Sequence, residues 1–383
     1  MNIGFLSPRS DAHPAIGTDY ISGLKLYLKQ KQIEGAIKLF AESIGFGGSE
    51  KEVYEKAEKL LMIDEADVLI AFIDERVIDI LKPLLYSSGK LMIVVNAGAN
   101  YPMNWVPQSN IIHLTLQHAF CNRLTGQAAA LQPGKDAATA TSFYDCGYLH
   151  IASAVKAFTN TGGNIVFNFV NNDKKYDDGF SVAPLTDFLA ANEDCSSVLC
   201  TFDSLPASLF YEKMRSASLK KDLHLFVSPM MLESGAMDRL AAGFPFAVTG
   251  YTPWLATQNN EENNIFIKTC AEDKKNATCF SLLGWETAMI LENILQQGAD
   301  ATSNGGALAS ELKKTIFSSP RGALTLDADT QFFLAPVSLC MIPANSNAVK
   351  WSTAGNYITE WENFIAEPTT GAVSGWTNTY LCY

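Results

Sequence analysis

The residue types that could do chemistry form none of the common catalytic motifs in this sequence. Gly45-Phe46-Gly47-Gly48 lies between an expected strand and an expected helix, where a dinucleotide-binding loop would sit. Position 50 is Glu50 instead of the third glycine of that loop, so we do not assign a dinucleotide site. No GxxxxGKS/T, GxSxG or HExxH motif occurs, and the five histidines include no metal-spaced pair. We therefore predict no enzyme, no catalytic residues, no cofactor and no metal site.

The most suggestive polar cluster is Asp74-Glu75-Arg76, directly after a buried apolar run. The Arg76 guanidinium could clamp an acidic group through two parallel hydrogen bonds. Asp74 and Glu75 are equally suited to the start of a helix, as an N-cap and a first-turn acid. Both interpretations stay open. Our hypothesis is that Arg76 contacts an acidic group on a ligand, and unchanged affinity in an Arg76→Ala variant would contradict it.

Length and composition favour two soluble domains. The chain has 383 residues, 48% hydrophobic and 18% charged, with a formal net charge of −12. A negative surface repels phosphate backbones, so nucleic acid is not an expected partner. No apolar stretch approaches the ~20 residues of a membrane-spanning helix. We expect no direct membrane span.

The N-terminus and the cysteines bear on the compartment. Met1 leads directly into a strand, without the apolar region of an export signal. The protein is therefore either cytoplasmic or an exported protein whose signal is absent from this chain. Eight cysteines form no CxxC pair. Cys195/Cys200 and Cys270/Cys279 are disulfide candidates in an oxidising compartment, but we favour buried free thiols.

Strands and helices alternate along the chain. Apolar runs predict strands at 3–6, 36–40, 67–72 and 91–95, with helices beginning near Gly17, Ser49 and Val77. Ser49 and Glu52 suggest a capping box. After a polar stretch the pattern restarts, with strands expected at 138–142, 164–170, 197–202, 223–228 and 244–248. Residues 259–317 read as mostly helical, and an aromatic-rich tail follows 332–342. This order predicts two doubly wound α/β units with parallel sheets.

The sequence resembles type I periplasmic binding proteins, in particular the branched-chain amino-acid-binding class and related receptor ligand-binding domains. The resemblance is carried by Ile3-Gly4-Phe5-Leu6-Ser7-Pro8 with Ile16-Gly17 and Ser22-Gly23; by Asp67–Phe72, Ser88–Ile93 and Ala97–Asn100; by Tyr144–Tyr148, Ala157-Phe158 and Gly162–Val166; and by Phe280–Ala288 and Ser319–Asp327. It implies two Rossmann-like lobes joined by a three-strand hinge. Lobe one would take residues 1–118 and 252–328, and lobe two 119–251 and 329–383.

The resemblance also implies a ligand cleft between the lobes, beyond the carboxyl ends of the strands. Tyr144, Asp145 and Tyr148 would cage an ammonium group, or form a solvated turn. Glu233 is a candidate acid, or a helix-start acid, and Met230 a pocket or core residue. Phe280 is interpreted either as a core residue of an amphipathic helix or as a ligand contact. The full candidate set is Ser7, His13, Asp74, Glu75, Arg76, Asn96, Gly98, Asn100, Tyr101, Tyr144, Asp145, Tyr148, Asp203, Ser204, Met230, Glu233 and Phe280.

The function implied is capture of an amino acid, or a related small carboxylate or amide, for an ABC importer. The expected partners are that small-molecule ligand and a membrane permease, and the expected location is the periplasm or the cell surface as a lipoprotein. One alternative is a ligand-sensing regulatory domain of the same fold in the cytoplasm. A less favoured alternative is an α/β enzyme with an unrecognised site.

Overall fold

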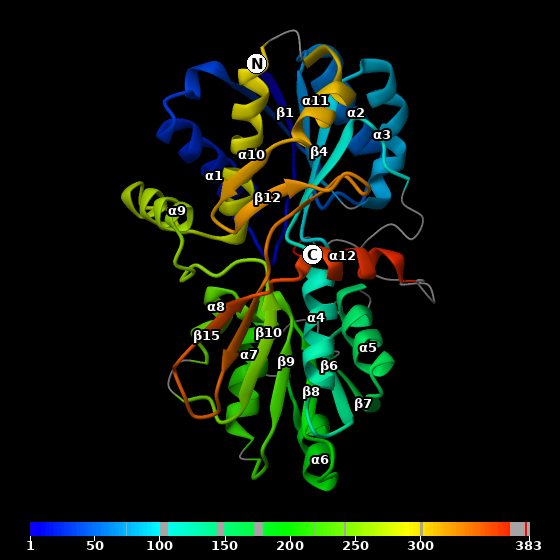
Figure 1. Cartoon of the computed structure of the whole chain (residues 1–383), viewed down its shortest axis with the longest axis vertical. Helices are drawn as coiled ribbons and strands as arrows, with labels where there is room; N and C mark the ends of the chain where they lie inside the picture. The colour runs from blue at the N-terminus through cyan, green and yellow to red at the C-terminus, as the bar shows by residue number, and fades with distance from the viewer. Residues whose placement is uncertain are drawn as a thin grey trace.

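The computed structural model describes residues 1–73, 75–99, 106–143, 149–171, 179–217, 219–240, 243–298, 302–367 and 380. Two α/β lobes are stacked along the long axis of the molecule (Figure 1). Each lobe is built around one sheet. The fold is the predicted pair of doubly wound lobes.

The first sheet has a parallel centre formed by buried apolar runs. Its described strands, in spatial order, are β11 (Ile316–Ser319), β12 (Gly322–Leu326), β13 (Phe332–Leu334), β5 (Ile111–Thr115), β4 (Leu91–Asn96), β3 (Val68–Phe72), β1 (Asn2–Ser7) and β2 (Lys38–Ser43). Every residue of β3, β4 and β5 is buried, because helices cover both faces of this part of the sheet. The β11–β12 and β12–β13 pairs are antiparallel. This antiparallel edge was not predicted.

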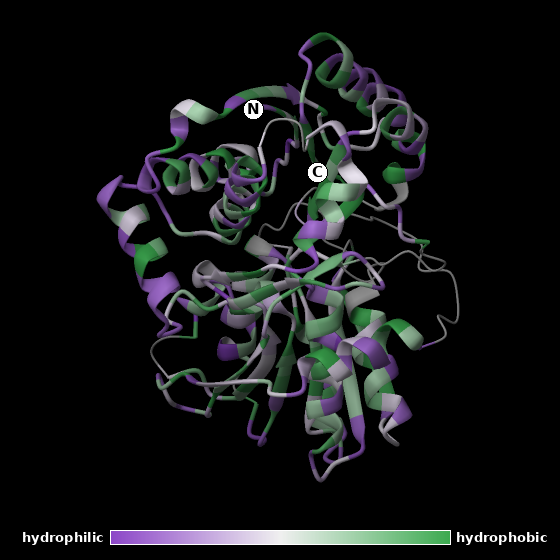
Figure 2. Cartoon of the chain, turned by 45° about the horizontal axis from the view of Figure 1, so that its top comes forward, coloured by the Kyte–Doolittle hydropathy of each residue, from purple (hydrophilic) through white to green (hydrophobic). Residues whose placement is uncertain are grey.

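The second sheet follows the same plan. In spatial order its described strands are β15 (Lys350–Thr353), β14 (Ser338–Ile342), β10 (Ala247–Thr252), β9 (His224–Val227), β8 (Ser197–Thr201), β6 (Asp136–Ser142) and β7 (Asn164–Asn171). Pairing is parallel from β10 to β7 and antiparallel among β15, β14 and β10. Figure 2 shows hydrophobic strands inside the lobes, with most hydrophilic residues on the surrounding helices and loops.

Helices flank both sheets. Those of the first lobe are α1 (Ile16–Gln30), α2 (Glu50–Glu58), α3 (Glu75–Ser88), α9 (Glu261–Glu272), α10 (Cys279–Gln296) and α11 (Gly305–Leu312). Those of the second are α4 (His118–Ala130), α5 (Leu149–Asn160), α6 (Ala183–Ala191), α7 (Ser204–Ser216), α8 (Ser234–Met237) and α12 (Tyr357–Ala366). The Ser49 half of the predicted capping box is present, because the Ser49 hydroxyl accepts the Glu52 amide at 3.3 Å.

Among the described residues, the chain passes between the two sheets after β5, after β10 and after β13. The first and third passages are tied together, because the Gln117 side-chain oxygen accepts the Ala335 amide at 3.3 Å. The third passage corrects the predicted lobe boundary at residue 328. Phe332 and Phe333 pair with β5 in the first sheet, so the chain leaves that lobe only after Leu334.

Two further expectations needed correction. The apolar run 332–342 is two strands in different sheets, β13 and β14, because Ala335-Pro336-Val337 carries the chain between lobes. The strand expected at 244–248 begins at Ala247, where pairing with β9 starts. The preference for free thiols is confirmed for the described cysteines: Cys121, Cys195, Cys200, Cys270, Cys279 and Cys340 are buried and unpaired.

Candidate ligand-binding site

The loops that follow β1 and β8 meet between the lobes. His13 Nε2 lies 3.1 Å and 3.2 Å from the two carboxylate oxygens of Asp203. Asp203 is at the N-cap position of α7, yet its side chain accepts no capping hydrogen bond from the described backbone. Its carboxylate is directed to His13 instead. One His–Asp contact therefore joins the lobes across the space where ligands of such open sheets bind.

A second acid, Glu233, lies beside this contact. It follows the 3₁₀ turn Pro229–Leu232 at the end of β9 and accepts a hydrogen bond from the Tyr380 phenol. Burial raises the pKa of Glu233 to about 7, although Tyr380 and His13 oppose the rise. Glu233 can thus exchange a proton near neutral pH.

Aromatic rings enclose these polar groups. The Tyr380 ring meets His13 at 4.9 Å between centroids, Phe280 at 5.0 Å and His118 at 5.7 Å, all edge to face. Phe280 comes from the first turn of α10, which a Thr278–Ser281 capping box holds in place. His118 begins α4. The cluster therefore combines the first helical turns beside the hinge with the loops after β1 and β9.

Buried hydroxyls at the same edge complete the polar set. Thr201 ends β8 and Ser228 follows β9, and both are fully buried. Among the described residues, neither hydroxyl has a hydrogen-bond partner. Because buried polar groups are normally hydrogen-bonded, both hydroxyls are candidates to bind a water molecule or a polar ligand. Met230, also buried, packs in the same apolar cluster as Phe280 and Tyr380.

The structure brings together five of the predicted residues: His13, Asp203, Met230, Glu233 and Phe280. The interpretation of Glu233 as a helix-start acid describes its position but not its contacts. Phe280 is a core residue whose ring also contacts His13 and Tyr380.

Other predicted residues have local structural roles. Asn96 donates to the Ile73 carbonyl at 3.1 Å and accepts the Gly98 amide at 2.8 Å, which shapes the loop after β4. Gly98 has φ +66°, and a Cβ there would lie 2.8 Å from the Gln117 amide nitrogen. Ser7 is half-buried at the end of β1. Outside the described residues lie Asp74, Asn100, Tyr101, Tyr144, Asp145 and Tyr148, with the side chains of Glu75, Arg76 and Ser204.

Sequence reasoning missed His118, Cys279 and Tyr380. The Cys279 thiol lies beside Glu233 and Tyr380, and burial raises its pKa well above the usual value. The Thr278–Ser281 pair was a usable signal for Cys279, because a capping box marks the first turn of a helix. No local pattern marks Tyr380, whose contacts with the other described residues are distant in sequence.

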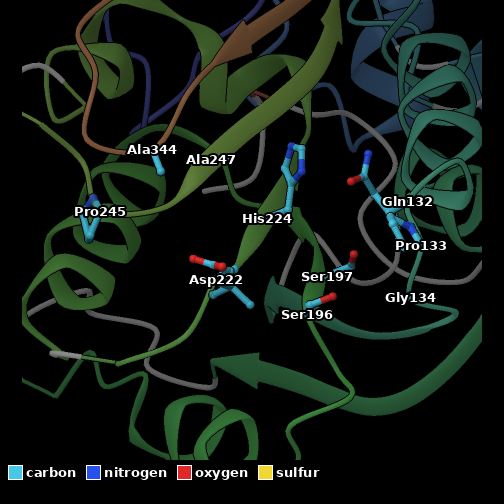
Figure 3. Close-up of a pocket in the computed structure, with 11 residues that line it drawn as sticks. Gln132, Pro133, Gly134, Ser196, Ser197, Asp222, His224, Pro245, Ala247 and Ala344 are labelled. Atoms are coloured by element: carbon cyan, nitrogen blue, oxygen red, sulfur yellow. The ribbon is translucent and has the colours of Figure 1, made fainter.

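A separate pocket lies at the other end of the second lobe. Figure 3 shows its lining, which includes Ser197, His224 and Ala247, the first residues of β8, β9 and β10. Its volume is about 360 Å³. Burial lowers the pKa of His224 to about 4, and its ring nitrogen Nε2 lies 2.8 Å from the Thr249 hydroxyl. Because this pocket faces the amino ends of the strands, we do not assign it as the principal ligand site.

The His13–Asp203 contact and Glu233 predict a pH-dependent stability. Burial lowers the pKa of His13, but Asp203 and Glu233 outweigh it and raise the pKa above 6.5. The stabilisation from His13 is therefore complete below pH 6.5 and is lost as pH rises through the raised pKa. Glu233 acts in the same direction, because its folded-state pKa of about 7 lies above the usual value of 4.5. The folded protein therefore loses stability as pH rises from 4.5 to about 7. The closed form binds more protons at both groups, so its stability should fall as pH rises.

When the pH is raised from 6 to 8, we expect the melting temperature of the wild type to fall by roughly 3 °C more than that of an Asp203→Asn/Glu233→Gln variant. Thermal unfolding followed by circular dichroism measures this difference. Comparison with the double variant removes the contribution of all other titrating groups. Identical pH profiles for the two proteins would contradict the prediction.

The described part of the chain holds no group of three or more His, Cys, Asp or Glu side chains placed to bind a metal ion. None of its helices combines the length and apolarity needed to cross a bilayer.

Two Rossmann-like lobes, three passages between them and a polar cluster at the strand ends define a type I two-lobed binding protein. Residues 1–347 match the family model described as periplasmic binding protein, and the chain belongs to this family. The family consists of non-enzymatic solute-binding proteins, so the prediction that the chain is not an enzyme is confirmed. A comparison with curated protein sequences found no match.

Solved structures of ABC-transporter binding proteins share this fold. A solute-binding protein from R. palustris in complex with benzoate is 21% identical, with a TM-score of 0.71 over 92% of this chain and 95% of that one. Another from Rhodopseudomonas palustris HaA2, in complex with p-hydroxybenzoic acid, is 15% identical, with a TM-score of 0.70 over 92% and 97%. A branched-chain amino acid transporter binding protein from Streptococcus pneumoniae, in complex with isoleucine, is 13% identical, with a TM-score of 0.66 over 92% and 99%.

Proposed function

We propose that this protein is an extracytoplasmic solute-binding protein that captures a small carboxylate, an amino acid or a related amide between its lobes and delivers it to an ABC-importer permease. Lobe one comprises residues 1–118 and 252–334, and lobe two comprises the rest. The observation that carries the proposal is the His13–Asp203 contact across the lobes, beside the buried carboxyl of Glu233. Family membership supports the same function.

The proposed mechanism is closure around the ligand. His13 belongs to the loop after β1 in one lobe, and Asp203 and Glu233 follow β8 and β9 in the other. Opening the lobes separates His13 from both acids. A ligand that contacts both lobes binds the closed form more tightly and shifts the population toward it. The permease then recognises the closed, loaded form.

The ligand class follows from the charges in the cleft. A ligand carboxylate would find a cation in His13, and in Arg76 if that side chain reaches the cleft. Glu233, with a pKa of about 7, can pair with an ammonium group or accept from a hydroxyl. Tyr144 and Asp145 would extend the ammonium cage. The structural neighbours hold benzoate, p-hydroxybenzoic acid and isoleucine, each of which carries a carboxylate group, and this supports a carboxylate-bearing ligand.

The test is a thermal-shift screen with benzoate, 4-hydroxybenzoate, isoleucine, other amino acids, amides and short peptides. A ligand at a hundred times its dissociation constant adds about 2.7 kcal/mol of stability, which raises the melting point by several degrees. For each hit, calorimetry should show at least a tenfold loss of affinity in His13→Ala and Arg76→Ala, because each removes a charged hydrogen-bond donor. Asp222→Asn, at the opposite end of the second lobe, is the matched control and should bind normally.

Failure of every compound to stabilise the protein would count against the transport function. Binding that is unaffected by His13→Ala would place the ligand elsewhere.

A further inference from the structure

The chain's own Tyr380 lies inside the cluster that we assign as the ligand site. Its side chain is 1% exposed. Its partners come from four segments far from it in sequence: the loop after β1, the start of α4, the end of the turn after β9 and the first turn of α10. Tyr380 therefore touches elements of both lobes at once.

The contacts of Tyr380 are those expected of a bound small molecule. The rings of His13, Phe280 and His118 meet the Tyr380 ring edge to face, at interplanar angles of 90°, 85° and 70°. This is the preferred geometry of aromatic pairs. At the far end of the ring, the phenol O–H donates to the Glu233 carboxyl. The site thus encloses an aromatic ring and accepts one hydrogen bond from its hydroxyl group.

We propose that Tyr380 is an internal ligand: its phenol fills a ring subsite formed by His13, His118, Glu233 and Phe280, and a cargo with a hydroxylated aromatic ring competes with it for that subsite. The proposal rests on the proposed function and names the ligand class. Hydrogen bonding to Glu233 distinguishes a phenol from a plain benzene ring, and the edge-to-face contacts distinguish an aromatic ring from an aliphatic chain.

The proposal has a direct consequence for affinity. A residue on the same chain competes at an effective concentration that can reach the millimolar range. Cargo binds only the fraction of molecules whose subsite is empty, so the apparent dissociation constant is the intrinsic one divided by that fraction. If Tyr380 occupies the subsite in at least nine of ten molecules, its removal should strengthen cargo binding about tenfold or more.

The experiment measures binding of p-cresol, the free side-chain analogue of tyrosine, to the full-length protein by calorimetry. Tyr380→Ala should bind p-cresol at least tenfold more tightly than the wild type. In the Tyr380→Ala background, Glu233→Gln should weaken p-cresol binding, and 4-methylanisole, which lacks the O–H donor, should bind at least tenfold more weakly than p-cresol. Tyr86→Ala is the matched control, because Tyr86 is 90% exposed, and should bind p-cresol like the wild type.

Equal p-cresol affinity in the wild type and Tyr380→Ala would overturn the proposal, and so would absence of binding to both. If Tyr380→Ala does not fold, Tyr380→Phe replaces it. This variant keeps the ring and loses only the hydroxyl, and should still bind p-cresol several-fold more tightly than the wild type; an unchanged affinity would overturn the proposal there too. A failure of the proposed function gives a different result: no compound of the thermal-shift screen then stabilises either the wild type or Tyr380→Ala.

Discussion

Replacing Arg321 with alanine should lower the free energy of unfolding of the first lobe by about 3–5 kcal/mol, one of the two largest single-residue effects that we expect. Arg321 and Glu286 are both 0% exposed. The guanidinium donates to the two Glu286 oxygens at 2.8 Å and 2.6 Å, and its third nitrogen donates to the Thr115 carbonyl at 3.0 Å. Removing Arg321 leaves a buried carboxylate without its counter-ion.

The Arg321 network also bears on the hinge. Thr115 is the last residue of β5, immediately before the first passage between the lobes. Glu286 lies on α10, which carries Phe280 at its start, and it also accepts a hydrogen bond from Ser319. Arg321 therefore connects the strand that leads into the hinge with the helix that contributes Phe280 to the candidate ligand cluster. Its loss should weaken ligand binding as well as stability.

Urea unfolding measures the stability change, and an Arg321→Met/Glu286→Leu double variant is the control. Replacement of both partners by apolar groups leaves no charge unpaired, so the double variant should be more stable than Arg321→Ala. A cost below about 1 kcal/mol for Arg321→Ala, the range of exposed ion pairs, would contradict the assignment of a buried pair.

Gly284→Ala should cost about 3 kcal/mol, because a Cβ at this position would lie 1.9 Å from the Tyr20 carbonyl oxygen of α1. The packing is reciprocal: a Cβ at Gly23 would lie 1.8 Å from the Ser281 carbonyl oxygen of α10. The backbones of α1 and α10 touch, and a methyl group must push them apart. Alanine favours helix by about 1 kcal/mol over glycine, so a net loss isolates the steric effect.

Gly35→Ala is the matched control for Gly284→Ala. A Cβ at Gly35 would meet nothing within 4 Å, so this variant should keep the wild-type melting temperature. Gly284→Ala should lower the melting temperature by roughly 5 °C or more, measured by circular dichroism. An unchanged melting temperature would show that the two helices are further apart than we describe.

The predicted elements were recovered best where a single strand or helix carries its own signal. The run 67–72 was identifiable as a central strand because burial on both faces leaves no polar alternation. Strand β5 at 111–115 was missed, although it is fully buried, because it is short and follows a polar stretch. The run 332–342 was assigned to one unit because local hydrophobicity carries no information about which sheet a strand joins.

For the candidate site, too, the sequence identified individual residues but not their contacts. His13, Asp203 and Glu233 were selected because each follows an expected strand, and parallel strands place such loops at one edge of a sheet. Which of them touch depends on how the two lobes close, and no sequence spacing encodes that: His13 and Asp203 are 190 residues apart.

The sequence by itself determined the family, the two α/β units and the absence of familiar catalytic motifs, because these depend on local hydrophobic periods and short motifs. Only the tertiary structure decided the composition of the candidate ligand cluster. Tyr380 has no distinguishing neighbours in sequence, and its role follows from contacts with His13, His118, Glu233 and Phe280, which the chain brings together by folding. The physical reason is that side-chain burial and proton affinity are set by neighbours in space, and at this site those neighbours come from both lobes.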